Sequence, residues 1–271
     1  MKLSELGEFG LLAELEQRGL ARGIEHDAAQ LPGGLVVTQD ALVEGVHFRL
    51  DRMSWHDLGF RAAVVNLSDL AASGADAKCL VVTIGAPAET EVADVIELYE
   101  GIGEAGVPVA GGDTTSAPQV VLSVTAIGCS ERVPGRAGAR PGDRIVVTGP
   151  LGAAGAAFRE GGYLRPPIRL AEGRQLARHA HAMLDISDGL AQDAGHLAER
   201  SGCRIVIDVG RVPLAPGATV DDLGFGEDFE LLAAVEDPAG FAEIGRCEEG
   251  EGVELLLDGH PIELAGYRHF G

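Results

Sequence analysis

Segments with the pattern of strands and segments with the pattern of helices alternate along the whole chain, and this alternation constrains the fold most. Apolar stretches rich in β-branched residues lie at 80–84, 120–128 and 144–148. Before and after them lie longer stretches with helical spacing, such as 55–74 and 169–182. Alternation of this kind predicts an α/β (α+β) protein with mixed sheets flanked by helices.

One stretch interrupts the alternation and predicts the domain boundary. Residues 132–143 are rich in glycine and proline and follow neither the period of a helix nor that of a strand. The length of 271 residues is enough for two domains of moderate size. We therefore predict an N-terminal domain over 1–134 and a C-terminal domain over 135–271.

The charge balance excludes several classes of function. Acidic residues number 42 against 21 lysines and arginines, which gives a formal net charge of -21. A chain this acidic lacks the basic face that nucleic acids and anionic membranes require. No segment reaches about 18 consecutive apolar residues, and no signal peptide is apparent, so we expect no membrane span. The four cysteines are scattered, which favours a reducing cytoplasm.

Aspartates recur beside or within apolar segments, where an ionised carboxylate is costly unless it is paired or bound to metal. Asp40 is expected to follow a strand at 34–38, and Asp113 a short strand at 107–110. Asp69 interrupts an apolar helix. Asp185 and Asp188 flank Ile186-Ser187. Each alone is more often a cap or turn residue, but five in similar settings favour magnesium bound to nucleotide phosphates.

Motifs of other phosphate and hydrolase chemistries are missing. The sequence has no G-x-x-x-x-G-K-[ST] loop, no G-x-S-x-G and no H-E-x-x-H. Its eight histidines show no metal-ligand pairing. Clustered aspartates, and not a phosphate-loop lysine or histidine ligands, are thus the predicted chemistry.

Six segments resemble, in order, those of thiamine-monophosphate kinases, in the superfamily of aminoimidazole ribonucleotide synthetase and selenophosphate synthetase. They are Gly-Ile-Glu-His-Asp-Ala-Ala (23–29), Thr-Gln-Asp-Ala-Leu-Val-Glu-Gly-Val-His-Phe (38–48), Asn-Leu-Ser-Asp-Leu-Ala-Ala (66–72), Gly-Gly-Asp-Thr-Thr (111–115), Leu-Asp-Ile-Ser-Asp-Gly-Leu (184–190) and Gly-Glu-Asp-Phe-Glu-Leu (226–231). The resemblance implies a two-domain aminoimidazole ribonucleotide synthetase-like fold. Its N-terminal domain would bind ATP and Mg²⁺ and form a homodimer through its sheet, and its C-terminal domain would close over the nucleotide.

The resemblance also implies a role for each matching residue. Expected metal ligands are Asp27, Thr38, Gln39, Asp40, Asp69, Asp113, Asp185 and Asp188, of which Asp113, Asp185 and Asp188 are expected to be catalytic. Expected ATP contacts are Tyr99, Gly112, Asp113, Arg136 and Ser187, and expected substrate contacts are His47, Glu227 and Tyr267. By residue type alone, the two tyrosines and His47 are more often packing residues, Arg136 is as often a solvated linker residue, and Glu227 could cap the next element.

The expected reaction is direct, Mg²⁺-assisted, in-line transfer of the γ-phosphoryl group from ATP to thiamine monophosphate, giving thiamine diphosphate and ADP. Two alternatives stay open at this stage. Phe225 stands where the family usually has glycine, which would fit a related ATP-dependent enzyme with another small-molecule acceptor. His26 and Gln39 replace an acid and a hydroxyl residue of the usual pattern, which would fit a non-catalytic nucleotide-binding homologue.

Overall fold

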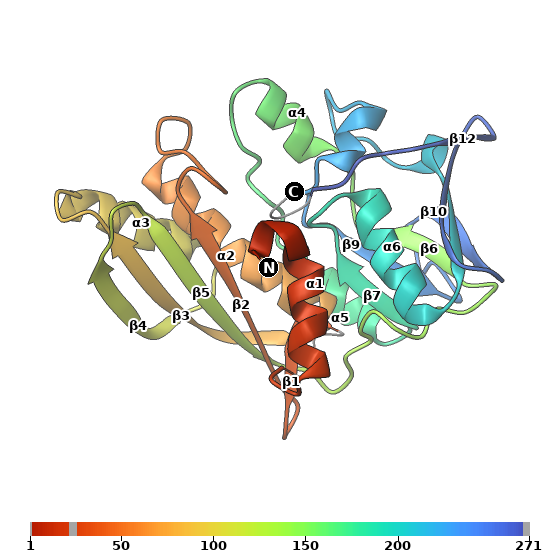
Figure 1. The fold of residues 1–271 in the computed structure, drawn as a ribbon, viewed down its shortest axis with the longest axis horizontal. Helices are drawn as coiled ribbons and strands as arrows, with labels where there is room; N and C mark the ends of the chain where they lie inside the picture. Colours follow the sequence, from red (N-terminus) through yellow and green to blue (C-terminus); the bar gives the residue numbers. More distant parts are fainter. Residues whose placement is uncertain (1, 22–25, 268–271) are drawn as a thin grey trace.

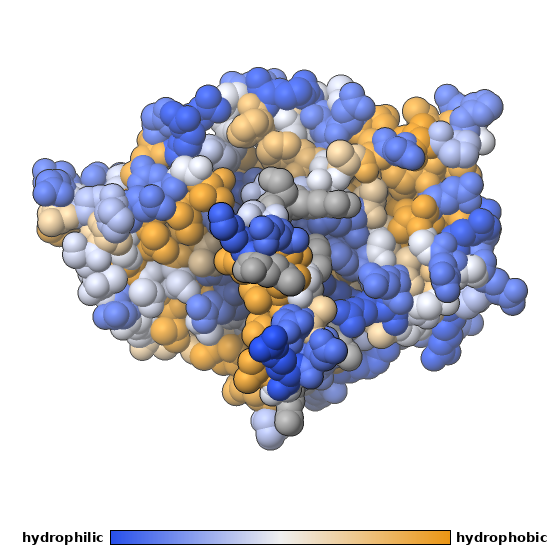
Figure 2. All heavy atoms as spheres, viewed as in Figure 1, coloured by the Kyte–Doolittle hydropathy of each residue, from blue (hydrophilic) through white to orange (hydrophobic). Residues whose placement is uncertain are grey.

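The computed structural model describes residues 2–21 and 26–267 and contains two α/β units that lie side by side (Figure 1). The N-terminal unit holds a five-stranded sheet and the C-terminal unit a seven-stranded sheet, which confirms the predicted fold class. In space-filling form, apolar residues reach the surface over the N-terminal unit between hydrophilic ones (Figure 2). None of the helices in the described ranges is long and apolar enough to cross a membrane.

The N-terminal unit has strand order β1-β2-β5-β3-β4, and β4 is the only parallel neighbour among its described strands. Even-numbered residues such as Leu122 and Val124 are buried against helix α2, while their odd-numbered neighbours face away. The N-terminal helix α1 and the elements of this unit are α1 (Leu3–Gln17), β1 (Ala29–Leu31), β2 (Leu35–Val43), α2 (Trp55–Ala72), β3 (Asp76–Ala86), α3 (Val92–Glu104), β4 (Val109–Ser116) and β5 (Val121–Cys129).

The C-terminal unit has strand order β12-β11-β8-β10-β6-β9-β7. Its helices are α4 (Ala153–Arg159), α5 (Leu170–Ala177) and α6 (Leu190–Ser201), and its strands are β6 (Arg144–Val147), β7 (Ala182–Asp185), β8 (Arg204–Asp208), β9 (Leu231–Val235), β10 (Ala242–Glu248), β11 (Gly252–Leu257) and β12 (His260–Ile262). Short 3₁₀ turns lie at Val209–Arg211 and Val220–Gly224.

Helix α2 is shared by both units and joins them. One side of it packs on β2 and β5, within the core of the N-terminal unit. Its last residues, Ala71 and Ala72, belong to a second buried cluster with Met183 of β7 and with Leu231 and Val235 of β9. The other face of the C-terminal sheet packs on α6. Because α2 touches both sheets, polar residues on it can reach groups of either unit.

Three expected element bounds are wrong, and two of them concern site residues. Strand β2 does not end before Asp40 but continues to Val43, and β4 runs through Asp113. The helix expected over 169–182 ends at Ala177, and Ala182–Asp185 is strand β7. Alanine, methionine and leucine favour helix locally, but pairing with β9 decides the conformation of this segment.

Strands β1, β10 and β12 were not expected from the sequence. The link between β5 and β6 contains no helix or strand, and the boundary at 134/135 lies within it and stays a prediction.

Candidate active site between the two units

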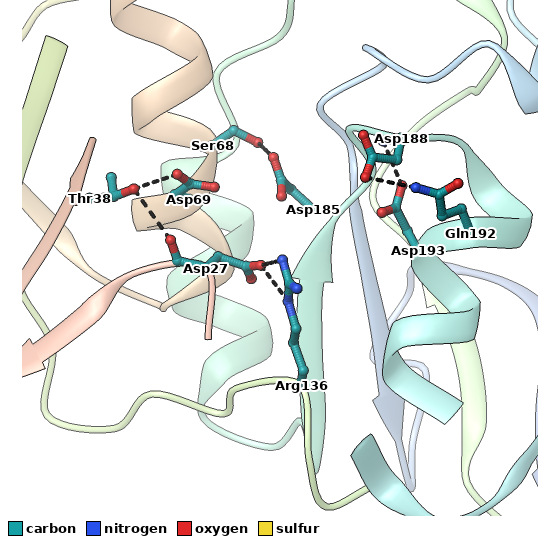
Figure 3. Close-up of polar contacts among 9 residues, drawn as sticks. All are labelled: Asp27, Thr38, Ser68, Asp69, Arg136, Asp185, Asp188, Gln192 and Asp193. Carbon is teal, nitrogen blue, oxygen red and sulfur yellow. Dashed lines mark hydrogen bonds and ion pairs between the residues drawn. The ribbon is translucent and has the colours of Figure 1, made fainter. Parts of the chain in front are cut away.

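Three carboxylates meet where α2 passes between the two sheets. Ligand oxygens of Asp27, Asp69 and Asp185 all lie within 4.8 Å of one another (Figure 3). Asp27 comes from the segment before β1, Asp69 from the C-terminal part of α2, and Asp185 from the end of β7. Side chains 158 positions apart in the sequence (185 minus 27) thus form one acidic cluster.

The last turns of α2 hold this cluster in place. Ser68 donates its hydroxyl proton to Asp185 Oδ2 at 2.6 Å. Thr38 of β2 donates to Asp69 Oδ2 at 2.5 Å and lies 3.3 Å from the Asp27 carbonyl oxygen. The buried Asn66 accepts the backbone N–H of Asp40 at 2.9 Å. The sequence motif around Asp69 therefore carries two positioning residues, Asn66 and Ser68, whose roles were not expected from the sequence.

Negative charge at the cluster exceeds the positive charge beside it. Burial first, and then the charges of Asp40, Asp185 and Asp27, raise the pKa of Asp69 well above its ordinary value. Burial and the charge of Asp27 raise the pKa of Asp185 to about 7, although Ser68 and Arg136 oppose the shift. A buried group of carboxylates that repel one another is the donor set that a hard divalent cation prefers, so these residues fit Mg²⁺.

Arg136 is the cation drawn beside the cluster in Figure 3. Its Nε and Nη2 both donate to Asp27 Oδ1, at 2.8 and 2.6 Å. The sequence left open whether Arg136 is a solvated linker residue, and the structure places it at the cluster with its side chain 27% exposed. A guanidinium in this position can also face a phosphate.

A second acidic group lies beside the first, at the start of α6. Asp188, Asp193 and His196 can bring ligand atoms within 4.8 Å of one another. The buried Asp193 accepts the N–H groups of Asp188 and Gly189, each at 3.0 Å, and Gln192 donates to Asp188 Oδ2 at 3.0 Å. Burial, together with the charges of Asp188 and Asp185, raises the pKa of Asp193 well above its ordinary value. Asp193 was not expected from the sequence; its signal is an acid in the first turn of a helix that follows the Asp-Ile-Ser-Asp motif.

The expected substrate residues of the C-terminal unit lie against the loop that carries Asp188. The N–H of Glu227 donates to the Ser187 carbonyl at 2.8 Å, and the N–H of Tyr267 donates to the Asp188 carbonyl at 3.0 Å. Gly226 has φ of 81°, and a Cβ there would lie 2.3 Å from the Ser187 carbonyl oxygen. Only glycine therefore permits this close approach.

His47 lies in the turn that follows β2. Its Nδ1 accepts the backbone N–H of Val43 at 3.0 Å, and its own N–H donates to the Val43 carbonyl at 2.9 Å. The ring is therefore oriented by the backbone of the N-terminal unit. Gly23, Ile24 and Glu25 of the first motif lie outside the described residues.

The residues expected on β4 lie away from the acidic cluster within one chain. Gly112 aligns across β3 and β5 with Asp40, three strands away, which is roughly 14 Å along a sheet. Asp113 aligns with Ala41 and so projects from the opposite face to Asp40. A Cβ at Gly112 would lie 1.7 Å from the Val82 carbonyl oxygen, so only glycine fits there.

Two other expected site residues also lie away from the cluster. Gln39 is on the outer face of the sheet, and Tyr99 is near β4. Gln39 bonds Ser123 at 2.8 Å and Thr125 at 3.3 Å, on the face opposite to Asp40. Tyr99 of α3 lines an apolar hollow of about 540 Å³ with Val95, Ile96 and Thr114. The structure thus gathers Asp27, Thr38, Asp40, Asp69 and Asp185 in one chain, but not Gln39, Tyr99, Gly112 or Asp113.

Comparison with known families matches both units. Residues 25–130 match the N-terminal domain of AIR synthase related proteins, and residues 140–256 match the C-terminal domain of AIR synthase related proteins.

Proteins that align with nearly the whole chain identify the family within this class. A thiamine-monophosphate kinase of Aquifex aeolicus is 33% identical, with 100% of each chain covered. One of Mycobacterium tuberculosis is 37% identical, with 99% of this chain and 93% of the relative covered. A solved structure described as AaThiL complexed with AMPPCP and TMP superimposes with a TM-score of 0.91 at 34% identity and 99% coverage of both chains. The chain belongs to the thiamine-monophosphate kinase family.

Proposed function

We propose that this protein transfers the γ-phosphoryl group of ATP to thiamine monophosphate, giving ADP and thiamine diphosphate. The observation that carries the proposal is the interdomain cluster of Asp27, Asp69 and Asp185, in a chain that aligns over its full length with thiamine-monophosphate kinases. The similar structure in complex with AMPPCP and TMP supports ATP as the donor. The two alternatives, another acceptor or a non-catalytic homologue, are not favoured by any comparison.

We assign the metal site to the cluster. Asp27, Asp69 and Asp185 would hold Mg²⁺ together with Asp40 and Thr38, and Asp188 would hold a further ion beside Asp193. When bound, Mg²⁺ would neutralise the phosphates and align them for in-line transfer. Gln39 would contribute to a metal only from the outer face of the sheet, where its amide bonds Ser123 and Thr125.

The protein has mainly to bind and orient its two substrates, because the acceptor phosphate is already ionised near neutral pH. Its second pKa is about 6. No general base is then required. Arg136 and Ser187 would contact ATP phosphates, since Arg136 bonds Asp27 of the cluster and Ser187 follows Asp185 by two residues. His47, Glu227 and Tyr267 would contact thiamine monophosphate.

We propose a homodimer in which strand β4 of one copy completes the site of the other. All of β4 is exposed, and β1 pairs with β2 only from Leu35 to Val37, so most of that edge of β2 has no strand partner among the described residues. Pairing of β4 with the free edge of β2 would remove two open sheet edges. It would also bring Gly112, Asp113 and the nearby Tyr99 beside the partner's β2, which they do not reach within one chain. Gly112 would then share a face with the partner's Asp40, and Asp113 with the partner's Gln39.

Two further predictions, the domain boundary and the location in the cell, remain part of the proposal. The division at 134/135 is retained because α2 and its sheet precede it and all seven strands of the second sheet follow it. We place the protein in the cytoplasm, which the four free cysteines support, since a reducing compartment keeps thiols unpaired.

The test is an assay with purified protein, ATP, magnesium and thiamine monophosphate in which thiamine diphosphate is measured directly. We expect equal amounts of ADP and thiamine diphosphate, and no product when a chelator removes the metal. ADP release without thiamine diphosphate, or tight nucleotide binding without turnover, would contradict the proposal. Thiamine without its phosphate is the matched control acceptor and should give no product.

A further inference from the structure

Arg61 is a buried cation on α2, about two turns before Asp69, which is the cluster residue on the same helix. Its side chain is 2% exposed and forms an ion pair with Glu227 of the C-terminal unit, whose side chain is 29% exposed. A charge this deeply buried is costly unless a partner compensates it. The pair joins residues 166 positions apart, so its partner comes from the other unit.

A row of three aromatic rings extends from Arg61 toward the surface. The Arg61 guanidinium lies 5.5 Å from the centroid of the Tyr163 ring. Tyr163 meets Phe158 edge to face at 6.3 Å, and Phe158 meets Phe225 at 5.1 Å. Phe158 is 43% exposed although it is a large apolar residue. The row therefore presents an aromatic surface next to Glu227, since Phe225 precedes Gly226-Glu227 in the chain.

The backbone around Glu227 is held in an unusual conformation. Glu227 and Phe229 have φ of 59° and 51°, a region that residues with side chains rarely adopt. Strain of this kind persists where surrounding contacts impose it, and it concentrates at functional sites. Here the N–H of Glu227 bonds Ser187 and its carboxylate bonds Arg61. Both ends of the residue are thereby fixed.

The spacing along α2 matches the shape of the acceptor. Arg61 and Asp69 are eight residues apart on one helix, which corresponds to about 12 Å. Thiamine monophosphate is an elongated molecule with two linked aromatic rings at one end and a phosphate at the other. With its phosphate at the Asp69 cluster, its ring end would extend toward Glu227 and the aromatic row.

We propose that Arg61 is a positioning residue that orients Glu227, and that Phe158, Tyr163 and Phe225 form the subsite for the heteroaromatic, cationic ring end of the acceptor. This inference rests on the proposed function and assigns residues that determine its acceptor specificity. Aromatic faces attract both flat rings and cations. A carboxylate held in place by Arg61 would accept hydrogen bonds from an amino group on the ring.

The test compares four variants in steady-state kinetics. Arg61→Met removes the charge, Arg61→Lys keeps the charge but not the planar fork, and Phe225→Leu keeps apolar volume without a ring. The matched control is Arg165→Met. Arg165 comes from the same loop as Tyr163, lies 4.0 Å over the Phe60 ring and pairs with Glu104 at 2.5 Å, but it does not contact Glu227.

We expect Arg61→Met to raise the KM for thiamine monophosphate by about tenfold or more, as for loss of one partner of a buried charge pair. The KM for ATP should stay within about twofold. Arg61→Lys should recover part of the loss, and Phe225→Leu should raise the KM for the acceptor by about threefold to tenfold. Arg165→Met should leave both values within about twofold.

An unchanged KM for thiamine monophosphate in Arg61→Lys and Phe225→Leu, or an equal rise in both KM values, would overturn the inference. These two variants decide the matter if Arg61→Met does not fold. Calorimetric titration with thiamine, which carries the rings without the phosphate, is the second measurement. If the native protein bound thiamine and these variants did not, the subsite would stand even if no thiamine diphosphate were formed, and so the two proposals can fail separately.

Discussion

The interdomain acidic cluster and strand β4 both contain aspartates of the kind expected to bind metal, yet the two regions differ in almost every physical respect. At the cluster, Asp185 is 5% exposed and is hydrogen-bonded by Ser68. On β4 every residue is exposed, and Asp113 accepts the N–H of its own neighbour Thr114 at 2.9 Å. The cluster is built from both units of one chain, whereas β4 is an open sheet edge.

The difference teaches which part of the site one chain can supply. Ser68, Thr38 and Asn66 hold the cluster in its geometry before any ligand binds. Asp113 has no such support, and it lies on the wrong face of its own sheet to join Asp40. We predict from this contrast that the cluster acts in the site of its own subunit, whereas β4 completes the site of the partner subunit.

The largest expected effect is that of Asp185→Asn. The amide keeps the shape but loses the charge and one acceptor, so kcat should fall by about a thousandfold. Stability should behave differently, because an amide in place of a buried, mutually repelled carboxylate removes a cost. We expect the free energy of unfolding in chelator to stay constant or rise, measured by urea titration near neutral pH. A clear loss of stability would show that Asp185 supports the fold and not the site.

The next effect tests whether β4 acts across the proposed dimer. Asp113→Asn and Asp69→Asn should each abolish most activity when made alone. Subunits of the two variants, co-expressed in equal amounts, should recover about a quarter of the native activity, because half of the dimers are mixed and each mixed dimer has one intact site. A mixture of Asp69→Asn with Asp185→Asn, both in the same cluster, should recover nothing and is the control. No recovery in the first mixture would place Asp113 in the same subunit as its cluster.

A smaller effect concerns stabilisation by magnesium. A ligand at about 100 times its Kd adds about 2.7 kcal/mol to the stability of the folded state. In a chain of this size, that corresponds to an increase in Tm of at most about 10 °C. The increase in Tm should vanish in Asp185→Asn and persist in Asp113→Asn at low protein concentration, where the cluster alone binds. Equal loss in both variants would remove the distinction between the two regions.

The smallest effect uses an acid outside the site as a contrast. Asp222 is buried and is bonded by Arg159 at 2.6 and 2.9 Å, and this partner lowers the pKa of Asp222 to about 2. Because the pKa is lower in the folded than in the unfolded state, the ionised Asp222 stabilises the fold at pH values above the unfolded pKa of about 4. This stabilisation is lost as the pH falls toward 2. Asp222→Asn should cost about 1 kcal/mol at pH 7, since Arg159 is half exposed and screened, and almost nothing near pH 2. Denaturation at both pH values gives the comparison, and a stabilising substitution would contradict it.

Several features of the molecule follow from the sequence alone. The alternation of segments predicts two α/β units, and the motifs predict aspartate-based chemistry, because residue type and local spacing carry both signals. Asp40, Asp69 and Asp185 were identified in this way, and Asp27 by the resemblance of its segment to thiamine-monophosphate kinases. Their setting was described less well, since Asp40 and Asp113 lie inside strands and not after them. Strand ends depend on pairing partners, which local spacing does not specify.

Only the tertiary structure decides which residues meet. The segment that ends in Asp185 has local helix formers, and pairing of β7 with β9 makes it a strand that points the carboxylate at α2. The ion pair of Arg61 with Glu227 and the separation of Asp113 from the cluster depend on contacts between residues far apart in the chain. The sequence by itself determined the kind of chemistry, because that depends on side-chain type. The pairing of Arg61 with Glu227 arose from the packing of α2 between two sheets. The face on which Asp113 lies arose from the register of four strands, and no single segment encodes either feature.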